Sequence, residues 1–527
     1  MSALEGATGP AAELGEGAAA AEARGRWVDS ATLLLVVAVC GVLFSTPLRR
    51  GGDLLPYAQD DLYYYLGVTR HLVRGAGSTF DGSTPTNGYH PLYLLVLWAA
   101  TAVSSSLRGI YRVLAVLDVA SAITIFTALR AMYRRRFQGA LLRNGFAAAI
   151  LYLSFFRLYH QMEVTLTLPL GFLFLFLLDR RPAEQTPRRW AGVGIVAALL
   201  TLSRLDAGLL VLLCVAAVLA QREFRETLTG AKVAAFLAGA VPPMAAYFLV
   251  NEHFFHRLTP ISGAAKQTKT MHGFALDVLP RSLSIEVVGM FALSFVALCL
   301  LPWLWRRLEV EQRVICVAAL LFPFAHWGIT LWMSDWMLWA WYKYSLLFAM
   351  SMILLLVGTA VTAQLPSRAQ MLAGAGVFVA AVLLLLSARY RMDMQMIEIA
   401  QAAEQVRTFA QTHPGRYAMG DRAGMVAYVD GQPMIQTEGL MMDDAFLNRI
   451  RRREPLREVL RAYDVDYYIG FDWKQPKNWP SEGCFQAKEP SQAGSSSPVM
   501  RGEFCEAPLA DIRTTSGRTL IFDVRTP

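Results

Sequence analysis

Long apolar segments recur along this chain of 527 residues, and they restrict its fold more than any other feature. Runs such as ATLLLVVAVCGVLF, AGLLVLLCVAAVLA and MLAGAGVFVAAVLLLLS approach the roughly 20 residues that a helix needs to cross the hydrocarbon core of a bilayer. Of all residues, 55% are hydrophobic and 17% are charged, whereas soluble domains contain roughly 25% charged residues. The mean hydropathy of +0.36 agrees with this pattern. The sequence therefore predicts an α-helical polytopic membrane protein.

Clusters of arginine in short loops predict the orientation of the chain. The loops RAMYRRRFQGALLR, DRRPAEQTPRRW, QREFRETLTGAK and WRRLEVEQR carry these clusters, and the positive-inside rule places all of them in the cytoplasm. This orientation predicts about 11 transmembrane helices, with the N-terminus inside and the C-terminus outside. The expected ranges are 29–47, 110–130, 144–160, 162–179, 190–203, 206–221, 231–250, 285–305, 314–333, 342–363 and 370–388. Because the net charge of +8 is distributed over such loops, nucleic acid is not an expected partner.

Two segments near the N-terminus are expected not to cross the membrane. Residues 1–28 are rich in Ala, Gly and Glu and lack a basic leader or cleavage signal, so we predict a disordered cytoplasmic tail before an uncleaved anchor. The run YHPLYLLVLWAATAV, residues 89–103, would invert every later loop if it crossed, so it is expected to lie in or near the outer interface. It belongs to a first external loop, residues 48–109, within a transmembrane module of residues 29–388.

Two further regions are expected outside the cytoplasm, a long loop of residues 251–284 and the C-terminal residues 389–527. The second region has the pattern of a small α/β domain, with helices in MIEIAQAAEQVRTFAQ and DDAFLNRIRRREPLREVLRAY. Its expected strands lie in RYAMGD, MVAYVD, DYYIGFD and RTLIFDV. In an oxidising compartment Cys484 and Cys505 can form a disulfide, which would close about 20 residues and add roughly 3 kcal/mol of stability.

An acidic pair opens the segment PYAQDDLYYYLGVTRHLV, which follows the first apolar run. Neighbouring residues of a helix point about 100° apart, so Asp60 and Asp61 are expected to serve different contacts. Partial burial would make either carboxylate a general base for an alcohol, whereas a helix N-cap is the structural alternative. The polar turn that follows supplies Asn87, Tyr89 and His90 as candidates for binding substrate. The three tyrosines after the pair are expected to be interfacial anchors.

Other charged residues on the outer side are also candidates. Glu163 stands between two spans, where an ionisable side chain is expected to be functional, with helix capping as the alternative. Arg204 and Asp206 share an outer hairpin and can pair with each other. Lys266 and Lys269 are three residues apart, so they can share a helix face and meet a phosphate, although a solvated basic loop explains them too.

Aromatic and histidine residues in the outer loops give weaker signals. The segment WMLWAWYKYS predicts an aromatic belt at the interface, with stacking on a sugar as the alternative. The spacing of His253, His256 and His272 does not match a zinc site, so no metal site is predicted from these residues.

The motifs together resemble the GT-C superfamily of integral-membrane glycosyltransferases. The likeness is to bacterial members related to arabinofuranosyltransferases and, more distantly, to protein O-mannosyltransferases and lipid A aminoarabinose transferases. The segment DDLYYYLGVTRHLVRGAGSTFDGSTPTNGYHPLY is similar to the acidic pair and NGYhPLW-like motif of that group. The segments HQMEVTL, LTPISGAAK and GRYAMGDRAGMVAYVDGQPMIQTEGL are similar to its later motifs, with Gln161 where the family has glycine.

The resemblance implies transfer of a sugar from a polyprenyl-phosphate donor to an extracytoplasmic glycan, lipid or protein, generally with inversion. It implies that Asp60 is the general base, that Asp61 supports it or binds the acceptor, and that Glu163 is a further acidic group. The phosphate-binding cations would be Lys266, Lys269 and Arg204. The lipid phosphate leaves as an anion, so positive charge is needed more than a second acid. Some family members use a divalent cation and others do not, so a metal requirement stays open.

Two other functions compete with this one, a lipid-linked sugar flippase or transporter and a non-catalytic scaffold for envelope assembly. No internal repeat is visible in the sequence, which disfavours a transporter with matching halves. A scaffold would not need carboxylates on the same side as a basic loop. The expected location is the bacterial cytoplasmic membrane, with membrane lipids as partners, and the identity of the sugar is not determined by the sequence.

Overall fold

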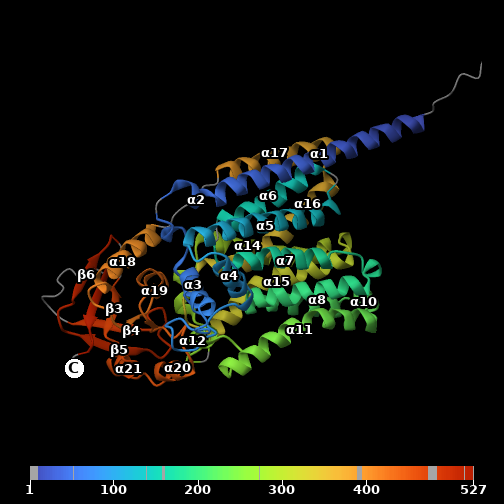
Figure 1. Cartoon of the computed structure of the whole chain (residues 1–527). Helices are drawn as coiled ribbons and strands as arrows, with labels where there is room; N and C mark the ends of the chain where they lie inside the picture. The colour runs from blue at the N-terminus through green and yellow to red at the C-terminus, as the bar shows by residue number, and fades with distance from the viewer. Residues whose placement is uncertain are drawn as a thin grey trace, which may run out of the picture.

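The chain forms a bundle of long helices with a small sheet-containing domain at one end (Figure 1). The computed structural model describes residues 10–51, 53–137, 139–156, 161–271, 273–387, 394–472, 484–515 and 517–525. His272 and the predicted boundary between the two parts at residue 389 lie outside the described residues.

Each of the segments predicted to span the membrane coincides with a helix. These helices are α1 (Pro10–Phe44), α5 (Leu107–Arg134), α6 (Ala140–Phe156), α7 (Val164–Leu178), α8 (Pro187–Ser203), α9 (Gly208–Ala220), α11 (Gly230–Phe255), α14 (Ile285–Leu304), α15 (Val310–Met333), α16 (Tyr344–Gln364) and α17 (Ser367–Ser387). Within the described part of the chain, 7 helices are long and apolar enough to cross a membrane, and shorter apolar segments lie in α6, α7, α9 and residues 91–103. The prediction of a polytopic helical membrane protein is therefore confirmed.

The disordered tail predicted for residues 1–28 is wrong from Pro10 onward, because α1 begins there. This part of the sequence is rich in Ala and Glu, which have high helix propensity, so helix formation does not require an apolar face. Residues 1–9 lie outside the described residues.

Shorter helices connect the long ones and form the end of the bundle that faces the domain. The helices at that end include α3 (Asp60–Val73), α4 (Pro91–Val103) and α12 (Ile261–Lys266). The others are α2 (Thr46–Arg50), η1 (Leu55–Tyr57), η2 (Pro182–Glu184), η3 (Leu205–Ala207), α10 (Arg222–Arg225), η4 (Leu276–Val278), α13 (Leu279–Ser282), η5 (Trp305–Arg307) and η6 (Ala340–Lys343). Helix α4 is the segment predicted to lie at the outer interface; it packs on α3, α5 and α8, and its depth in the membrane stays a prediction.

Local sequence explains where several long helices begin. The hydroxyl of Thr186 accepts a hydrogen bond from the amide of Arg189, and Pro187 occupies the first position of α8, where its missing N–H costs nothing. At the start of α15, Glu309 and Gln312 form a reciprocal capping box. These caps satisfy amide groups that have no partner within the helix.

The C-terminal region is a small α/β domain. Its five-stranded sheet has the order β2-β1-β3-β7-β6, in which β1 is parallel to β2 and β3 while β7 is antiparallel to β3 and β6. The strands of this sheet are β1 (Tyr417–Met419), β2 (Met434–Gln436), β3 (Tyr467–Asp472), β6 (Ala510–Arg513) and β7 (Arg518–Asp523). Its helices are α18 (Met394–Ala410), α19 (Ala423–Asp430), α20 (Asp444–Arg451) and α21 (Leu456–Ala462).

One predicted strand of this domain, MVAYVD, is wrong, because the segment lies in helix α19. Residues 423–426 and Tyr428 are buried, and the helix packs between α18 and α3. The alternation of Val and Tyr suits a strand, but the position between two helices determines the structure.

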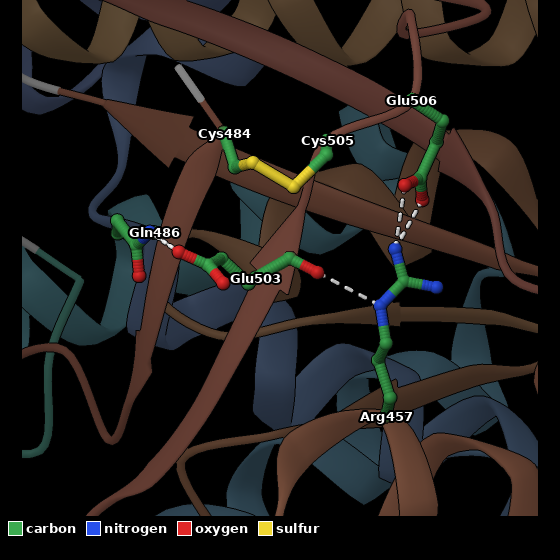
Figure 2. Close-up of a disulfide and its surroundings, with 6 residues drawn as sticks. All are labelled: Arg457, Cys484, Gln486, Glu503, Cys505 and Glu506. Atoms are coloured by element: carbon green, nitrogen blue, oxygen red, sulfur yellow. Dashed lines mark hydrogen bonds and ion pairs between the residues drawn. A yellow bond between two sulfur atoms is a disulfide. The ribbon is translucent and has the colours of Figure 1, made fainter.

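A separate hairpin of β4 (Phe485–Glu489) and β5 (Met500–Phe504) is closed at its base by a disulfide between Cys484 and Cys505. Figure 2 shows Arg457 of α21 beside the disulfide, donating to the carbonyl of Glu503 at 2.8 Å and pairing with Glu506. The loop of the hairpin reaches the bundle, where the amide of Ser496 and the hydroxyl of Ser497 donate to Asp335 at 2.9 and 2.6 Å. The hairpin therefore links the domain to the connection between α15 and α16.

Loss of the disulfide is expected to loosen this hairpin first. A Cys484→Ser, Cys505→Ser variant should lower the free energy of unfolding of the domain by about 3 kcal/mol, because the unfolded chain gains loop entropy. Hydrogen exchange of the β4 and β5 peptides in the purified full chain measures the change. Cys299→Ser, at an exposed free cysteine of α14, is the control. Unchanged exchange in the hairpin of the double variant would contradict the expectation.

Candidate active site

Two adjoining pockets lie where the domain meets the helical bundle. The inner pocket is lined by residues that include Tyr65, His90, Glu163, Arg204, Tyr342 and Met441. The outer pocket is lined by residues that include Asp60, Trp336, Trp339, Asp421, Glu438 and Gln492. Asp61, Tyr64, Lys266, Trp341 and Leu440 line both. The shared residues therefore mark the junction of the two pockets.

Asp60 joins the bundle to the domain. Its carboxylate accepts hydrogen bonds from the backbone amides of Gly424 and Met425, at 3.2 and 2.6 Å. Both amides belong to the first turn of α19, where N–H groups have no partner within the helix and the helix dipole favours an anion. A Cβ at Gly424 would lie 2.5 Å from the carbonyl oxygen of Asp60, so this approach requires glycine. Burial raises the pKa of Asp60 to about 7, although the two amides oppose the shift.

Asp61 occupies a different position, as the helical spacing of the pair predicts. Asp61 lines both pockets. Its electrostatic neighbours are the cations Lys266 and Arg204 and the acids Glu163 and Asp421. Burial raises the pKa of Asp61 to about 6; Lys266 opposes the shift and Glu163 adds to it. Asp61 therefore lines both pockets, whereas the carboxylate of Asp60 accepts two backbone amides; the role of Asp60 as the base stays a prediction.

The tyrosines that follow the pair are not interfacial anchors, because all three are at most 7% exposed. The hydroxyl of Tyr63 donates to the carbonyl of Leu55 at 2.7 Å, and that of Tyr65 accepts from the amide of His90 at 3.1 Å. They fix α3 inside the protein rather than at a lipid surface.

Lys266 and Lys269 do not share a helix face, because α12 ends at Lys266. Lys266 lines both pockets, with its ammonium 6.0 Å from the ring centroid of Trp336. Burial disfavours its charge, but Tyr342 and Asp61 outweigh this effect and raise the pKa of Lys266. The ammonium of Lys269 instead donates to the carbonyls of Gly273, Leu331 and Trp332, the last two in the final turn of α15. Lys269 thus lies where a lysine caps the end of α15, and its phosphate-binding role stays a prediction.

A network of buried charged side chains lies beside the inner pocket. The guanidinium of Arg204 donates to Glu163, and the two side chains are only 3% and 4% exposed. It also donates to both carboxylate oxygens of Asp206, at 3.0 and 2.8 Å, so the predicted Arg204–Asp206 pair forms and extends to a second acid. Asp206 accepts a further hydrogen bond from Tyr344 at 3.1 Å, and Nε2 of His326 lies 3.0 Å from it. Arg204 is fixed by these partners where it faces the pocket.

Of the three residues predicted to bind substrate, His90 lines the inner pocket, whereas Asn87 and Tyr89 are not part of the lining of either of these two pockets. Its Nε2 lies 3.8 Å from Glu163, but burial lowers the pKa of His90 to about 4, so the imidazole is neutral and the contact is not an ion pair at neutral pH. Asn87 instead accepts from the amide of Ile261 and donates to Asn251, both at 2.9 Å, and thereby positions the start of α12. The hydroxyl of Tyr89 lies 2.7 Å from that of Ser78 within the loop.

The domain contributes pocket residues that the sequence does not single out. Asp421, Glu438 and Gln492 come from loops of the domain and line the outer pocket. The turn after Asn87 packs closely on the same region, since a Cβ at Gly88 would lie 1.9 Å from the carbonyl oxygen of Leu440. The segment GDRAGMVAYVDGQPMIQTEGL carries two of the acids, and its likeness to the family motif is the available signal.

A divalent cation does not fit an obvious donor set. Among the described residues, no three His, Cys, Asp or Glu side chains are grouped so that they could hold a metal ion. Asp60 already accepts two backbone amides and Glu163 already binds Arg204.

Comparisons with known proteins identify the fold. No family model matches the sequence, and no curated protein matches it significantly. ArnT from Cupriavidus metallidurans bound to undecaprenyl phosphate is similar in structure, with a TM-score of 0.53, 14% identity, and coverage of 91% of this chain and 99% of ArnT. The apo form of ArnT gives a TM-score of 0.50 with 12% identity over 89% and 97% of the two chains. The chain therefore has the fold of a GT-C glycosyltransferase.

Proposed function

We propose that the protein is an inverting glycosyltransferase that moves a sugar from a polyprenyl-phosphate donor to an acceptor outside the cytoplasm. The observation that carries this proposal is the position of Asp61 and Lys266 at the junction of two pockets. A base and a cation at one junction suit a displacement in which an alcohol attacks while a phosphate leaves.

In the proposed reaction, Asp61 accepts the proton of the acceptor hydroxyl as its oxygen forms a bond to the anomeric carbon. The bond from that carbon to the phosphate oxygen breaks, and the electron pair leaves with the lipid phosphate. Lys266 stabilises the departing anion, with Arg204 as a second cation in the inner pocket. No acid is needed on the leaving group, so the proposed reaction requires one carboxylate at the junction, Asp61.

The inner pocket is assigned to the donor because both cations face it. The binding of undecaprenyl phosphate to ArnT, which has a similar fold, supports a polyprenyl-phosphate donor for this chain. Glu163 and Asp206 hold Arg204 in place, and Asp60 positions the domain over the pockets.

The proposed location is the bacterial cytoplasmic membrane, with the N-terminus inside and the domain outside. The basic loops between spans support this orientation. The disulfide Cys484–Cys505 supports it as well, because disulfides persist in oxidising compartments.

Purified full-length protein in nanodiscs, given polyprenyl-phosphate arabinofuranose, mannose or another hexose together with envelope extracts, tests the function. We expect one donor to be consumed, with release of polyprenyl phosphate measured by mass spectrometry. In proteoliposomes, movement of an intact donor across the bilayer without cleavage would indicate a flippase instead. No consumption and no movement of any donor would favour a scaffold.

The pH dependence of transfer should follow Asp61. A base must be ionised, so activity is expected to fall about tenfold per pH unit below a pKa of about 6. Because Lys266 favours the charged form of Asp61, Lys266→Met should move this acidic limb to higher pH. Initial rates at saturating donor between pH 4.5 and 8 measure the limb. If the acidic limb does not move in Lys266→Met, the group that titrates is not Asp61.

A further inference from the structure

We propose that the outer pocket binds a neutral, hydroxyl-rich glycan as the acceptor, in preference to a phosphorylated lipid headgroup or a peptide. This inference rests on the proposed function and concerns the pocket on the domain side of Asp61. It follows from an aromatic wall, a wall of hydrogen-bonding groups, and the charge of the pocket.

Tryptophans from the connection between α15 and α16 form the aromatic wall. Trp336, Trp339 and Trp341 line the outer pocket. The rings of Trp339 and Trp341 are nearly parallel, with an angle of 13° between their planes and 5.6 Å between their centroids. Indole faces are large and apolar, so they suit the C–H face of a sugar ring. The loop of the hairpin fixes this connection through Asp335, which precedes the first of the tryptophans.

Loops of the domain form the hydrogen-bonding wall. The amide nitrogen of Gln492 donates to Asp421 at 3.1 Å, and the backbone amide of Gln492 approaches Glu438 at 3.4 Å. The hydroxyl of Ser491 also donates to Glu438, at 3.0 Å. A carboxylate and an amide held next to each other can accept from and donate to neighbouring hydroxyl groups, as a sugar requires.

The charge of the outer pocket disfavours an anionic acceptor. Its ionisable lining consists of the acids Asp60, Asp61, Asp421 and Glu438 and the cations Lys266 and Arg422. Acids therefore outnumber cations, and a phosphate would add charge of the same sign. Burial raises the pKa of Glu438, and Asp421 and Glu489 add to this shift.

The inner pocket differs in this respect, because its cations Lys266 and Arg204 face only two acids, Asp61 and Glu163. Lys266 faces both pockets beside Asp61. A donor phosphate on the inner side and an acceptor hydroxyl on the outer side would then approach the anomeric carbon from opposite directions, as inversion requires.

Saturation-transfer NMR with the full chain in nanodiscs tests the pocket directly. The probes are hexasaccharide fragments of arabinan, mannan and glucan, each also prepared with a terminal phosphate, and a Ser/Thr-rich peptide. We expect a neutral hexasaccharide to bind, its phosphorylated form to bind at least tenfold more weakly, and the peptide not to bind. Gln492→Ala and Trp339→Phe should each weaken binding about tenfold.

Matched controls are Gln486→Ala, in the same hairpin but outside the outer pocket, and Trp332→Phe, at an exposed position of α15. Both should bind like the unmodified chain. Glu438→Gln, which keeps shape and hydrogen bonding, should retain binding and lose part of the discrimination against phosphate.

The outcomes separate this inference from the proposed function. Binding of a neutral glycan without donor consumption supports the pocket and contradicts the transferase. Donor consumption with the sugar recovered on a peptide or a phospholipid supports the transferase and overturns the pocket assignment. Absence of binding by all neutral fragments, or equal binding by Gln492→Ala and Gln486→Ala, also overturns it.

Discussion

An Asp61→Asn variant is expected to lose sugar transfer by a factor of about 10²–10⁴, because it removes the proposed general base while keeping the size of the side chain. The loss should appear in kcat, since the acceptor proton is transferred only in the reaction step. Binding of the donor should change little, because Lys266 remains in place. Single-turnover release of polyprenyl phosphate from the purified variant measures the step.

Asp60→Asn is the matched control, because it makes the same change at the adjacent residue. An asparagine at this position still offers one oxygen to the amides of Gly424 or Met425, so we expect activity within about tenfold of the unmodified chain. The acidic limb of the pH profile should stay in this variant. A greater loss in Asp60→Asn than in Asp61→Asn would return the role of base to Asp60.

Loss of the Lys266 ammonium should give the second large effect. A hydrogen bond to a charged group contributes about 1.5–3 kcal/mol, so kcat/KM for the donor in Lys266→Met should fall roughly 10–150-fold. The inhibition constant of free polyprenyl phosphate should rise in parallel, because the same cation meets the same phosphate.

Lys269→Met is the control for this variant. Its ammonium bonds to backbone carbonyls near the end of α15, so the change should lower thermal stability and leave the affinity for polyprenyl phosphate within about threefold. Equal losses of affinity in both variants would mean that a general basic loop, rather than Lys266, attracts the phosphate.

The membrane helices could be predicted because burial in lipid is a property of each segment by itself. A run of about 20 apolar residues identifies a span without knowledge of its neighbours. The start of α1 was not predictable in this way, since residues 10–28 have helix propensity but no apolar run. Helix α19 was missed because its neighbours α3 and α18, which are distant in sequence, determine its structure.

The candidate site likewise contains residues that the sequence indicates and contacts that only the folded chain shows. Asp61, Glu163, Arg204 and Lys266 could be found because charged residues beside membrane spans are rare and conspicuous. From the sequence, Asn87 and Lys269 look like equally good site candidates. In the folded chain, however, their side chains form hydrogen bonds with backbone groups.

The residues that the domain contributes to the outer pocket were beyond prediction from pattern alone. Gln492 lies in a hairpin loop more than 400 positions after Asp61, and an ordinary polar loop gives no signal of chemistry. The tryptophans of WMLWAWYKYS were expected chiefly as an interfacial belt. Docking of the domain makes all three of them one wall of a pocket.

The close backbone contacts between the first external loop and the domain limit how such proteins can be recombined. Gly424 meets the carbonyl of Asp60, and Gly88 meets that of Leu440, with no room for a side chain at either glycine. A domain transplanted from a distant relative would therefore not fit the backbone of the first external loop. A working chimera should require residues 53–90 and 394–525 to be exchanged as a single cassette.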